Sequence, residues 1–305
     1  MSDEGRGVPG RERQDTLEYW VLKGLLGLLH AIPERTAAGL AGGVTAAAMP
    51  VLRRLREIGL GNLAIAFPER DEAWREATLR ESFRNLGRLA AEFAHFRDLR
   101  PENIRDKVGF ASEGDEQRWR EGLTSGSRVI ATGHFGNWEL LVQAQGLLGY
   151  PVTLVHREFK NPRADEIVGA VRGRVGTQAL PKRAAARDLL RRLRRGELIA
   201  LPIDQREIGG GGYPVPFFGE PALTTLGPAR LAQLVQAPLQ VAVLARIGDS
   251  MQHEIVVQEP IDPPPKRDKD PELLVGMMEK VNRSFEDCIR RYPSQWLWVH
   301  RRWHR

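Results

Sequence analysis

One short segment, residues 134–139, combines side chains that are suited to acid–base chemistry. It reads His134-Phe135-Gly136-Asn137-Trp138-Glu139. A neutral imidazole that a carboxylate holds in one tautomer can take a proton from an alcohol, which turns the alcohol oxygen into a nucleophile. The pair therefore predicts general-base catalysis, and the alternative is a histidine and a glutamate that hydrogen-bond only to stabilise a turn.

The spacing of His134 and Glu139 constrains the local structure. On a continuous helix, five residues rotate by about 500°, which leaves the two side chains roughly 140° apart and unable to meet. The apolar run 129–132 instead predicts a strand, with His134 in the turn at its carboxyl end and Glu139 in the first turn of the next helix. A carboxylate there is favoured by the helix dipole and can fold back to the imidazole. Gly133 and Gly136 make room for the tight turn.

Short apolar runs alternate with helical patterns from Arg128 onward, which is typical of βα repeats. We therefore expect an α/β protein with a mostly parallel central sheet flanked by helices. In such sheets ligands bind outside the carboxyl ends of the strands, which is where His134 lies. The expected strands are 129–132, 152–155, 177–180, 198–201, 239–244 and 254–257, and the expected helices include 137–148, one capped by Asn161 with Pro162 at its first position, 225–235 and 271–291.

The first third of the chain predicts helices and few strands. We expect a disordered tail over 1–15, a helical N-terminal membrane-associating region over 16–100, and an α/β catalytic domain over 101–305. Thr16 is placed to cap the first helix and Pro33 to end it, and residues 72–98 form a further helix. The first helix either packs on the core or rests in a membrane interface, because its Leu-rich face suits both. No run of roughly 18 apolar residues, as a membrane span needs, is present.

Composition narrows the partners and the kinds of site. Lys and Arg outnumber Asp and Glu by 45 to 39, giving a net charge of +6. This balance favours anionic partners such as phosphate headgroups or an acidic carrier protein, and the lack of familiar RNA- or DNA-reading motifs argues against nucleic acid. Cys288 is the only cysteine, which excludes an intramolecular disulfide and a Cys-rich zinc site.

The segment Ala131–Glu139 resembles the active-site motif of the bacterial lipid A biosynthesis (lauroyl/myristoyl) acyltransferases, a branch of the His-x4-Asp/Glu lysophospholipid acyltransferase group. Further blocks match that family in the expected order and extend the resemblance over roughly residues 55 to 305. They are Asn62-Leu63 with Ala66-Phe67-Pro68-Glu69, Arg157 with Lys160-Asn161-Pro162, Asp204-Gln205, Pro216-Phe217-Phe218-Gly219 with Ala222-Leu223-Thr224, and Gln295-Trp296-Leu297-Trp298-Val299-His300-Arg301-Arg302.

The resemblance implies an O-acyltransferase that moves a fatty acyl chain from a thioester of an acyl carrier protein or CoA to a hydroxyl of a glycolipid, first of all a lipid A precursor. It implies no metal and no bound cofactor. The enzyme would work at the cytoplasmic face of the inner membrane, peripherally or through an N-terminal anchor. Alternative acceptors are a lysophospholipid or a phosphoinositol mannoside. Alternatives of another class are a hydrolase and a non-catalytic membrane-binding or carrier-binding protein.

By the same resemblance His134 is the base, Glu139 its orienting partner, and a further set of residues binds substrate. That set is Arg157, Asn161, Asp204, Gln205, Phe218 and Thr224. Arg157 suits a phosphate as a bidentate donor, or else caps a strand end. Asp204 ends an apolar strand at the same sheet edge as His134, or else only forms a turn. Phe217, Phe218 and Thr224 line an acyl or headgroup pocket, or else the two phenylalanines belong to the core.

Two basic segments predict surfaces. The arginines between Arg183 and Arg195 alternate with leucines at helical spacing, which indicates either a solvated face over the core or a docking face for anionic lipid or an acidic acyl carrier protein. The C-terminal cluster resembles an interfacial anchor, because Trp and Arg favour the headgroup layer. Its members are Trp296, Trp298, Trp303, Arg301, Arg302 and Arg305.

Overall fold

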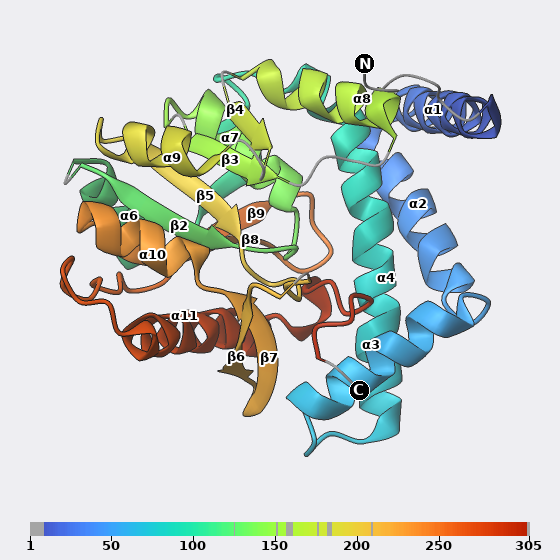
Figure 1. Ribbon diagram of the computed structural model, residues 1–305. Helices are drawn as coiled ribbons and strands as arrows, with labels where there is room; N and C mark the ends of the chain where they lie inside the picture. Colours follow the sequence, from blue (N-terminus) through green and yellow to red (C-terminus); the bar gives the residue numbers. More distant parts are fainter. Residues whose placement is uncertain are drawn as a thin grey trace.

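A computed structural model describes residues 9–124, 126–150, 152–156, 161–175, 177–181, 185–208 and 210–303. It consists of a central sheet with helices on both faces and a group of N-terminal helices standing along one side (Figure 1). The expected α/β fold with a mostly parallel sheet is confirmed.

The sheet has seven strands in the order β1-β9-β8-β2-β5-β3-β4. Only β8 and β9 pair antiparallel, and every other neighbouring pair is parallel. All residues of β2 and β8 are buried, as expected for central strands covered on both faces. The strands are β1 (Val108–Phe110), β2 (Arg128–Thr132), β3 (Val152–His156), β4 (Gln178–Pro181), β5 (Leu198–Pro202), β8 (Leu239–Arg246) and β9 (His253–Val257).

The helices around the sheet follow the predicted pattern closely. Asn161 caps α8 as expected, because its side chain accepts the backbone N–H groups of Arg163 and Ala164, with Pro162 in the first turn. The predicted helix 271–291 is confirmed to the residue as α11. These helices are α6 (Glu113–Thr124), α7 (Trp138–Leu147), α8 (Pro162–Gly173), α9 (Ala185–Leu193), α10 (Gly227–Val235) and α11 (Pro271–Arg291).

The N-terminal helices precede the sheet in the chain. They are α1 (Pro9–His30), α2 (Glu34–Ala48), α3 (Arg53–Ala66), α4 (Glu72–His95), the 3-10 turn η1 (Phe96–Asp98) and α5 (Ile104–Lys107). Helix α2 packs closely on α4, since a Cβ on Gly87 would lie 2.3 Å from the carbonyl oxygen of Ala41. Within the described ranges, no helix is both long and apolar enough to cross a bilayer.

Helix α1 begins earlier than the sequence predicted. It starts at Pro9, so Thr16 lies inside the helix and does not cap it, and residues 9–15 are helical where a disordered tail was expected. Proline suits the first position of a helix, and the residues that follow include Arg11, Glu12 and Arg13, which are good helix formers. Residues 1–8 lie outside the described part of the chain.

The hairpin of β6 (Gly212–Phe217) and β7 (Glu220–Thr225) was not predicted. Phe217 pairs with Glu220 across a two-residue turn in which Phe218 and Gly219 have φ angles of +52° and +77°. Two positive φ angles are what a tight hairpin turn of this length requires.

The expectation that the C-terminal tryptophans form an interfacial anchor is wrong. Trp296, Trp298 and Trp303 are buried in the core behind the 3-10 turn η2 (Pro293–Gln295), and Arg302 is buried with them. Each indole N–H finds an acceptor inside the protein: Asp204, the carbonyl of Pro293 and the carbonyl of Phe217, respectively. Paired in this way, the large side chains of Trp stabilise the core.

Candidate active site

The turn between β2 and α7 carries His134 and is held by close backbone contacts. The backbone N–H of Gly136 donates to the carbonyl of Gln295 at 2.7 Å. Gly136 has φ +54°, and a Cβ there would lie 1.8 Å from the carbonyl oxygen of Leu244. A Cβ on Gly133 would lie 2.8 Å from the carboxyl carbon of Asp204. Both glycines are therefore needed for the close approach of this turn to its neighbours.

Asp204, just beyond β5, is the direct partner of His134. Its Oδ1 lies 3.1 Å from Nδ1 of the imidazole, and its Oδ2 accepts the backbone N–H of His134 at 2.8 Å and the indole N–H of Trp296 at 3.0 Å. A carboxylate only accepts, so the proton of the neutral imidazole sits on Nδ1 and Nε2 keeps its lone pair. The side chain of His134 is 26% exposed, whereas that of Asp204 is 2% exposed. Nε2 is thus the ring nitrogen whose lone pair can accept a proton.

The electrostatics of this pair make the histidine a stronger base. Burial by itself lowers the pKa of His134, but the charge and the hydrogen bond of Asp204 outweigh it, so the pKa lies above the ordinary value. Burial likewise raises the pKa of Asp204, yet the charge and hydrogen bonds of His134 bring it below the ordinary range. The negative charge of Glu139 adds to the rise at His134, and Arg172 opposes it.

Glu139 lies in the first turn of α7, as predicted, but its carboxylate is bonded to Arg172 of α8 and not to His134. The guanidinium donates to both carboxylate oxygens, at 2.6 and 3.0 Å, and both side chains are buried. Glu139 acts on the imidazole only through its charge in this structure. The place expected for Glu139, beside the imidazole of His134, is taken by Asp204, which lies at Nδ1.

The other residues that were predicted to bind substrate belong to several parts of the fold. Gln205 follows Asp204 and is exposed. Asn161 caps α8 and also donates to the backbone carbonyl of Asp15 and the carboxylate of Glu18, which ties α8 to α1. Arg157 lies outside the described residues.

Phe218 and Thr224 belong to the β6–β7 hairpin and are buried. The hydroxyl of Thr224 accepts from the guanidinium of Arg302 at 2.6 Å. The ring of Phe218 packs beside Phe67, with 5.7 Å between ring centroids. In this structure both side chains have the surroundings of core residues.

His300 is a further residue near the pair that the sequence analysis did not assign to the site. Its Nε2 accepts the backbone N–H of Arg206 at 3.2 Å, two residues beyond Asp204. Burial lowers the pKa of His300 below its ordinary value, although the charge of Asp204 opposes this. Its signal was the C-terminal block of the resemblance, in which it stands between two tryptophans and two arginines.

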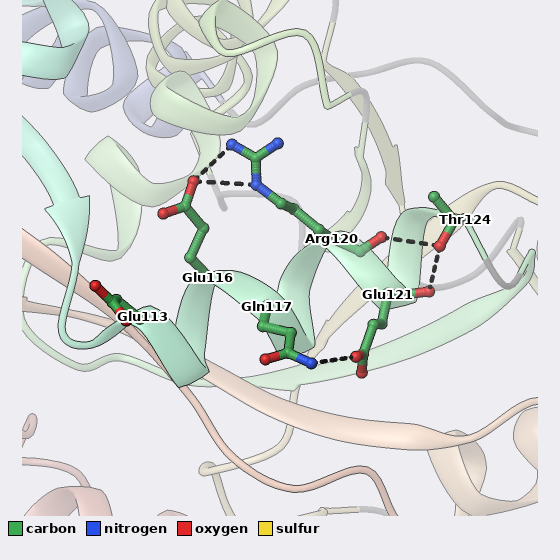
Figure 2. A pocket seen from close by; sticks show the side chains of 6 residues that line it. All are labelled: Glu113, Glu116, Gln117, Arg120, Glu121 and Thr124. Carbon is green, nitrogen blue, oxygen red and sulfur yellow. Dashed lines mark hydrogen bonds and ion pairs between the residues drawn. The ribbon is translucent and has the colours of Figure 1, made fainter.

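A hollow on the outer face of α6 is not part of this site. It is lined by Glu113, Glu116, Gln117, Arg120, Glu121 and Thr124 (Figure 2). Its polar contacts join residues of the same helix, such as the guanidinium of Arg120 and the carboxylate of Glu116. Helix α6 leads into the amino end of β2, whereas His134 follows the carboxyl end.

In the part of the chain that the structure describes, no cluster of three or more His, Cys, Asp or Glu side chains is arranged to hold a metal ion.

Comparison with known proteins gives a consistent family. Residues 10–305 match the family described as bacterial lipid A biosynthesis acyltransferase. The chain is 27% identical over 287 residues to the lipid A biosynthesis palmitoleoyltransferase of Escherichia coli (strain K12), covering 93% of this chain and 90% of that protein. It is 26% identical over 289 residues to the lauroyltransferase of the same strain, with the same coverage, and 24% identical over 250 residues to the myristoyltransferase, covering 80% and 73%. The resemblance inferred from the motif blocks is confirmed.

Proposed function

Because the chain belongs to the bacterial lipid A biosynthesis acyltransferase family and is therefore an acyltransferase, we propose that it acylates a hydroxyl of a lipid A precursor with His134 as general base. The observation that carries this assignment is the contact between Nδ1 of His134 and the carboxylate of Asp204, which leaves Nε2 to receive a proton.

The proposed reaction is a direct transfer. Nε2 of His134 takes the proton of the acceptor hydroxyl while its oxygen attacks the thioester carbonyl carbon, and Asp204 stabilises the imidazolium that forms. The tetrahedral intermediate then collapses, the C–S bond breaks, and the thiolate takes the proton from Nε2. The positive end of the α7 dipole, beside His134, favours the oxyanion of the intermediate. No bound cofactor takes part in this scheme.

Glu139 has a revised role in the proposal. Held by Arg172, it contributes negative charge near the imidazole, and Asp204 orients the ring.

The proposal also includes residues that bind the substrates. Gln205 is exposed beside Asp204 and suits a polar headgroup, and Arg157, which follows β3 in the chain, suits a phosphate of the acceptor or the donor.

The other members of that set take supporting roles. Phe218 and Thr224 shape the wall of an acyl-binding region from within the hairpin, and Asn161 fixes the start of α8, the helix that carries Arg172.

The donor is proposed to be a thioester carried by an acidic acyl carrier protein, with CoA as the alternative. Helix α9 supports this choice. Its leucines Leu189 and Leu193 are buried, whereas Arg187 and Arg191 are exposed, as is Arg194 directly after the helix. The helix thus has both a core face and a solvated basic face, and the basic face suits an acidic carrier.

The enzyme is proposed to work on the cytoplasmic face of the inner membrane through α1 and α2. Along α1, exposed apolar side chains recur at helical spacing, and α2 continues the apolar surface. These side chains are Leu17, Trp20, Val21, Leu25 and Leu28 on α1, and Leu40 and Val44 on α2. Lys23 lies 5.1 Å from the ring of Trp20, a combination that suits a headgroup layer. A helix pair lying in the interface brings the active site to a lipid acceptor.

Mass spectrometry of reaction products tests the proposal. The purified protein is offered acyl carrier protein and CoA thioesters together with lipid A precursors, lysophospholipids and phosphoinositol mannosides. We expect ester formation on the lipid A precursor, and none with His134→Ala. Acyl transfer that persists in His134→Ala contradicts the proposed base, and acylation of a different lipid class corrects the acceptor.

A second reaction without acceptor separates transfer from hydrolysis. A transferase releases little free fatty acid from the thioester when no hydroxyl-bearing lipid is present. Rapid release under those conditions would assign a hydrolase. A protein that binds vesicles and carrier protein but yields no product with any acceptor would be the non-catalytic alternative.

A further inference from the structure

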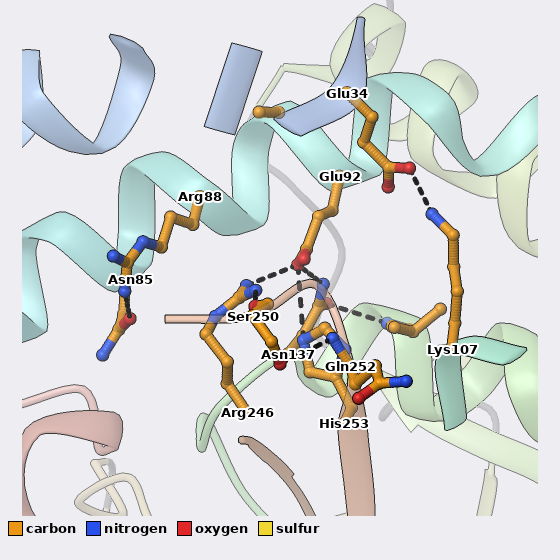
Figure 3. A network of polar contacts seen from close by, with 12 residues as sticks. Glu34, Asn85, Arg88, Glu92, Lys107, Asn137, Arg246, Ser250, Gln252 and His253 are labelled. Atoms are coloured by element: carbon orange, nitrogen blue, oxygen red, sulfur yellow. Dashed lines mark hydrogen bonds and ion pairs between the residues drawn. The ribbon is translucent and has the colours of Figure 1, made fainter. Parts of the chain in front are cut away.

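A buried carboxylate from the N-terminal helices reaches the active-site turn. Glu92 of α4 is 2% exposed, and its Oε2 accepts from the guanidinium of Arg246 at 2.7 Å and from the side-chain amide of Asn137 at 2.5 Å. Nε2 of His253 lies 3.6 Å from the same oxygen. Figure 3 shows these three side chains converging on Glu92 from the N-cap of α7, from the end of β8 and from the start of β9.

The charge on Glu92 is fixed by its surroundings. Burial alone raises the pKa of Glu92, but His253 and Arg246 together lower it to about 2. The carboxylate is therefore ionised across the pH range in which enzymes work. The two carboxylate oxygens of Glu92 have different contacts. Oε1 has no hydrogen-bond partner among the described residues, whereas Oε2 accepts from both Arg246 and Asn137. The network is built around the oxygen that meets Asn137.

Asn137 connects this network to α7, the helix that follows the turn of His134. Its Oδ1 accepts the backbone N–H of Leu140 and so caps α7, while its Nδ2 donates to Glu92. A side-chain amide has one acceptor end and one donor end, and Glu92, which only accepts, fixes which end faces the helix. Asn137 stands three residues after His134 and two before Glu139.

Arg246 holds the same turn at a second point. Its backbone N–H donates to Oε1 of Gln295 at 2.7 Å, and the backbone carbonyl of Gln295 accepts the N–H of Gly136 at 2.7 Å. The ion pair of Glu92 and Arg246 thus reaches the turn through Asn137 on one side and through Gln295 on the other. Both contacts fall between His134 and α7.

We propose that Glu92 is a positioning residue for acyl transfer, whose carboxylate, paired with Arg246, holds the Asn137 cap and thereby sets the place of His134. Helix α4 is also the helix on which α2 packs, at Gly87, so one helix links the apolar N-terminal surface to the catalytic turn. This inference rests on the proposed function of His134 and adds the residue that keeps it in place.

The test exchanges the polarity of the Glu92–Asn137 hydrogen bond. Glu92→Gln removes the charge, and Asn137→Asp keeps a cap but sets two carboxylates against each other. In the double variant Glu92→Gln/Asn137→Asp, the new amide donates to the new carboxylate, which restores a hydrogen bond between the two side chains, but the amide N–H that replaces Oε2 no longer accepts from Arg246. We expect kcat to fall about 10- to 100-fold in each single variant, with KM for the donor little changed, and to be higher in the double variant than in either single variant but below wild type.

Two further variants separate positioning from stability. Asp115→Asn is the matched control, because Asp115 is also buried and accepts a backbone N–H, that of Val257, away from the turn. It should lower Tm without lowering kcat. If Glu92→Gln does not fold, Glu92→Leu/Arg246→Met removes both charges together, an exchange that buried ion pairs often tolerate. A low kcat at a retained Tm is expected there as well.

The failures can be told apart. A wild-type kcat in folded Glu92→Gln, or two impaired single variants without recovery in the double, overturns the positioning role while the proposed function stands. Acyl transfer that survives His134→Ala overturns the proposed function itself, whatever Glu92 does.

Discussion

Nδ1 of His134 lies 3.1 Å from Oδ1 of Asp204, and the other oxygen of the same carboxylate accepts the backbone N–H of that histidine. One buried carboxylate therefore fixes both the ring and the backbone of the proposed base. The two residues stand 70 positions apart in the chain, at the carboxyl ends of the neighbouring strands β2 and β5. Parallel pairing of these strands is what brings them together.

Asp204→Asn should abolish most of the activity while the protein stays folded. The amide can donate to Nδ1, which would place the imidazole proton on Nε2, the wrong nitrogen for a base. In a serine-protease triad the same exchange lowers kcat about 10⁴-fold, and we expect a loss of two to four orders of magnitude here, on the order of that precedent. Steady-state kinetics check this, with the exposed Asp249→Asn as control. Activity near wild type in Asp204→Asn would contradict the orienting role.

The rate should rise with pH through the pKa of His134. Only the neutral imidazole accepts a proton, and Asp204 raises the pKa of His134 above its ordinary value despite burial. The acid limb of kcat/KM should therefore lie above pH ~6.5, the pKa of an unperturbed histidine. The sign for stability is opposite. A raised folded pKa stabilises the fold fully below the unfolded pKa, and this contribution is lost as pH rises through the folded pKa.

NMR titration of the His134 ring and a pH–rate profile measure the same group independently. In Asp204→Asn the titration should move to lower pH, because the negative charge that raises the pKa is gone. An acid limb that does not move between wild type and this variant would mean that another group controls the rate.

Removing one partner of the buried Glu139–Arg172 pair should destabilise the fold. Arg172→Met leaves the carboxylate of Glu139 buried and unpaired, and breaking such a pair costs about 3–5 kcal/mol. The double variant Glu139→Leu/Arg172→Met should regain most of that stability. The charge of Glu139 raises the pKa of His134 more than the charge of Arg172 lowers it. If this charge matters for catalysis, the double variant still has low activity, and its acid limb lies at lower pH than that of the wild type. Urea unfolding with kinetics at several pH values separates the two effects, and full activity in the stable double variant would assign the pair to stability alone.

The sequence could predict the strand, turn and helix around His134 because the signals are local. The apolar run, two glycines and the cap Asn137 lie within ten residues of one another. The same holds for Asn161 and Pro162 at the start of α8. Each of these predictions depends on backbone preferences that a short segment sets by itself.

The partners of Glu139 and His134 were beyond the reach of local patterns. Glu139 meets Arg172, which is 33 residues away, and the choice between Glu139 and Asp204 for the imidazole depends on how α8 and β5 dock against β2. The tryptophans show the same limit. Trp and Arg near a chain end suit a membrane interface or a core equally well by composition, and tertiary packing placed Trp296 and Trp298 in the core.

The apolar face of α1 should be required for membrane binding. Leu17, Val21 and Leu25 are exposed on one face of the helix, and burying each of these side chains in the interface contributes roughly 1–2 kcal/mol. Leu17→Ser/Val21→Ser/Leu25→Ser should therefore weaken partitioning to vesicles of anionic and zwitterionic lipid by about two orders of magnitude or more. Flotation with the vesicles measures this. Leu273→Ser, an exposed leucine on α11, is the matched control and should bind as wild type. Because the substituted side chains are exposed, Tm and activity on a detergent-dispersed acceptor should stay near wild type. Equal flotation of the triple variant and the control would mean that another surface meets the lipid.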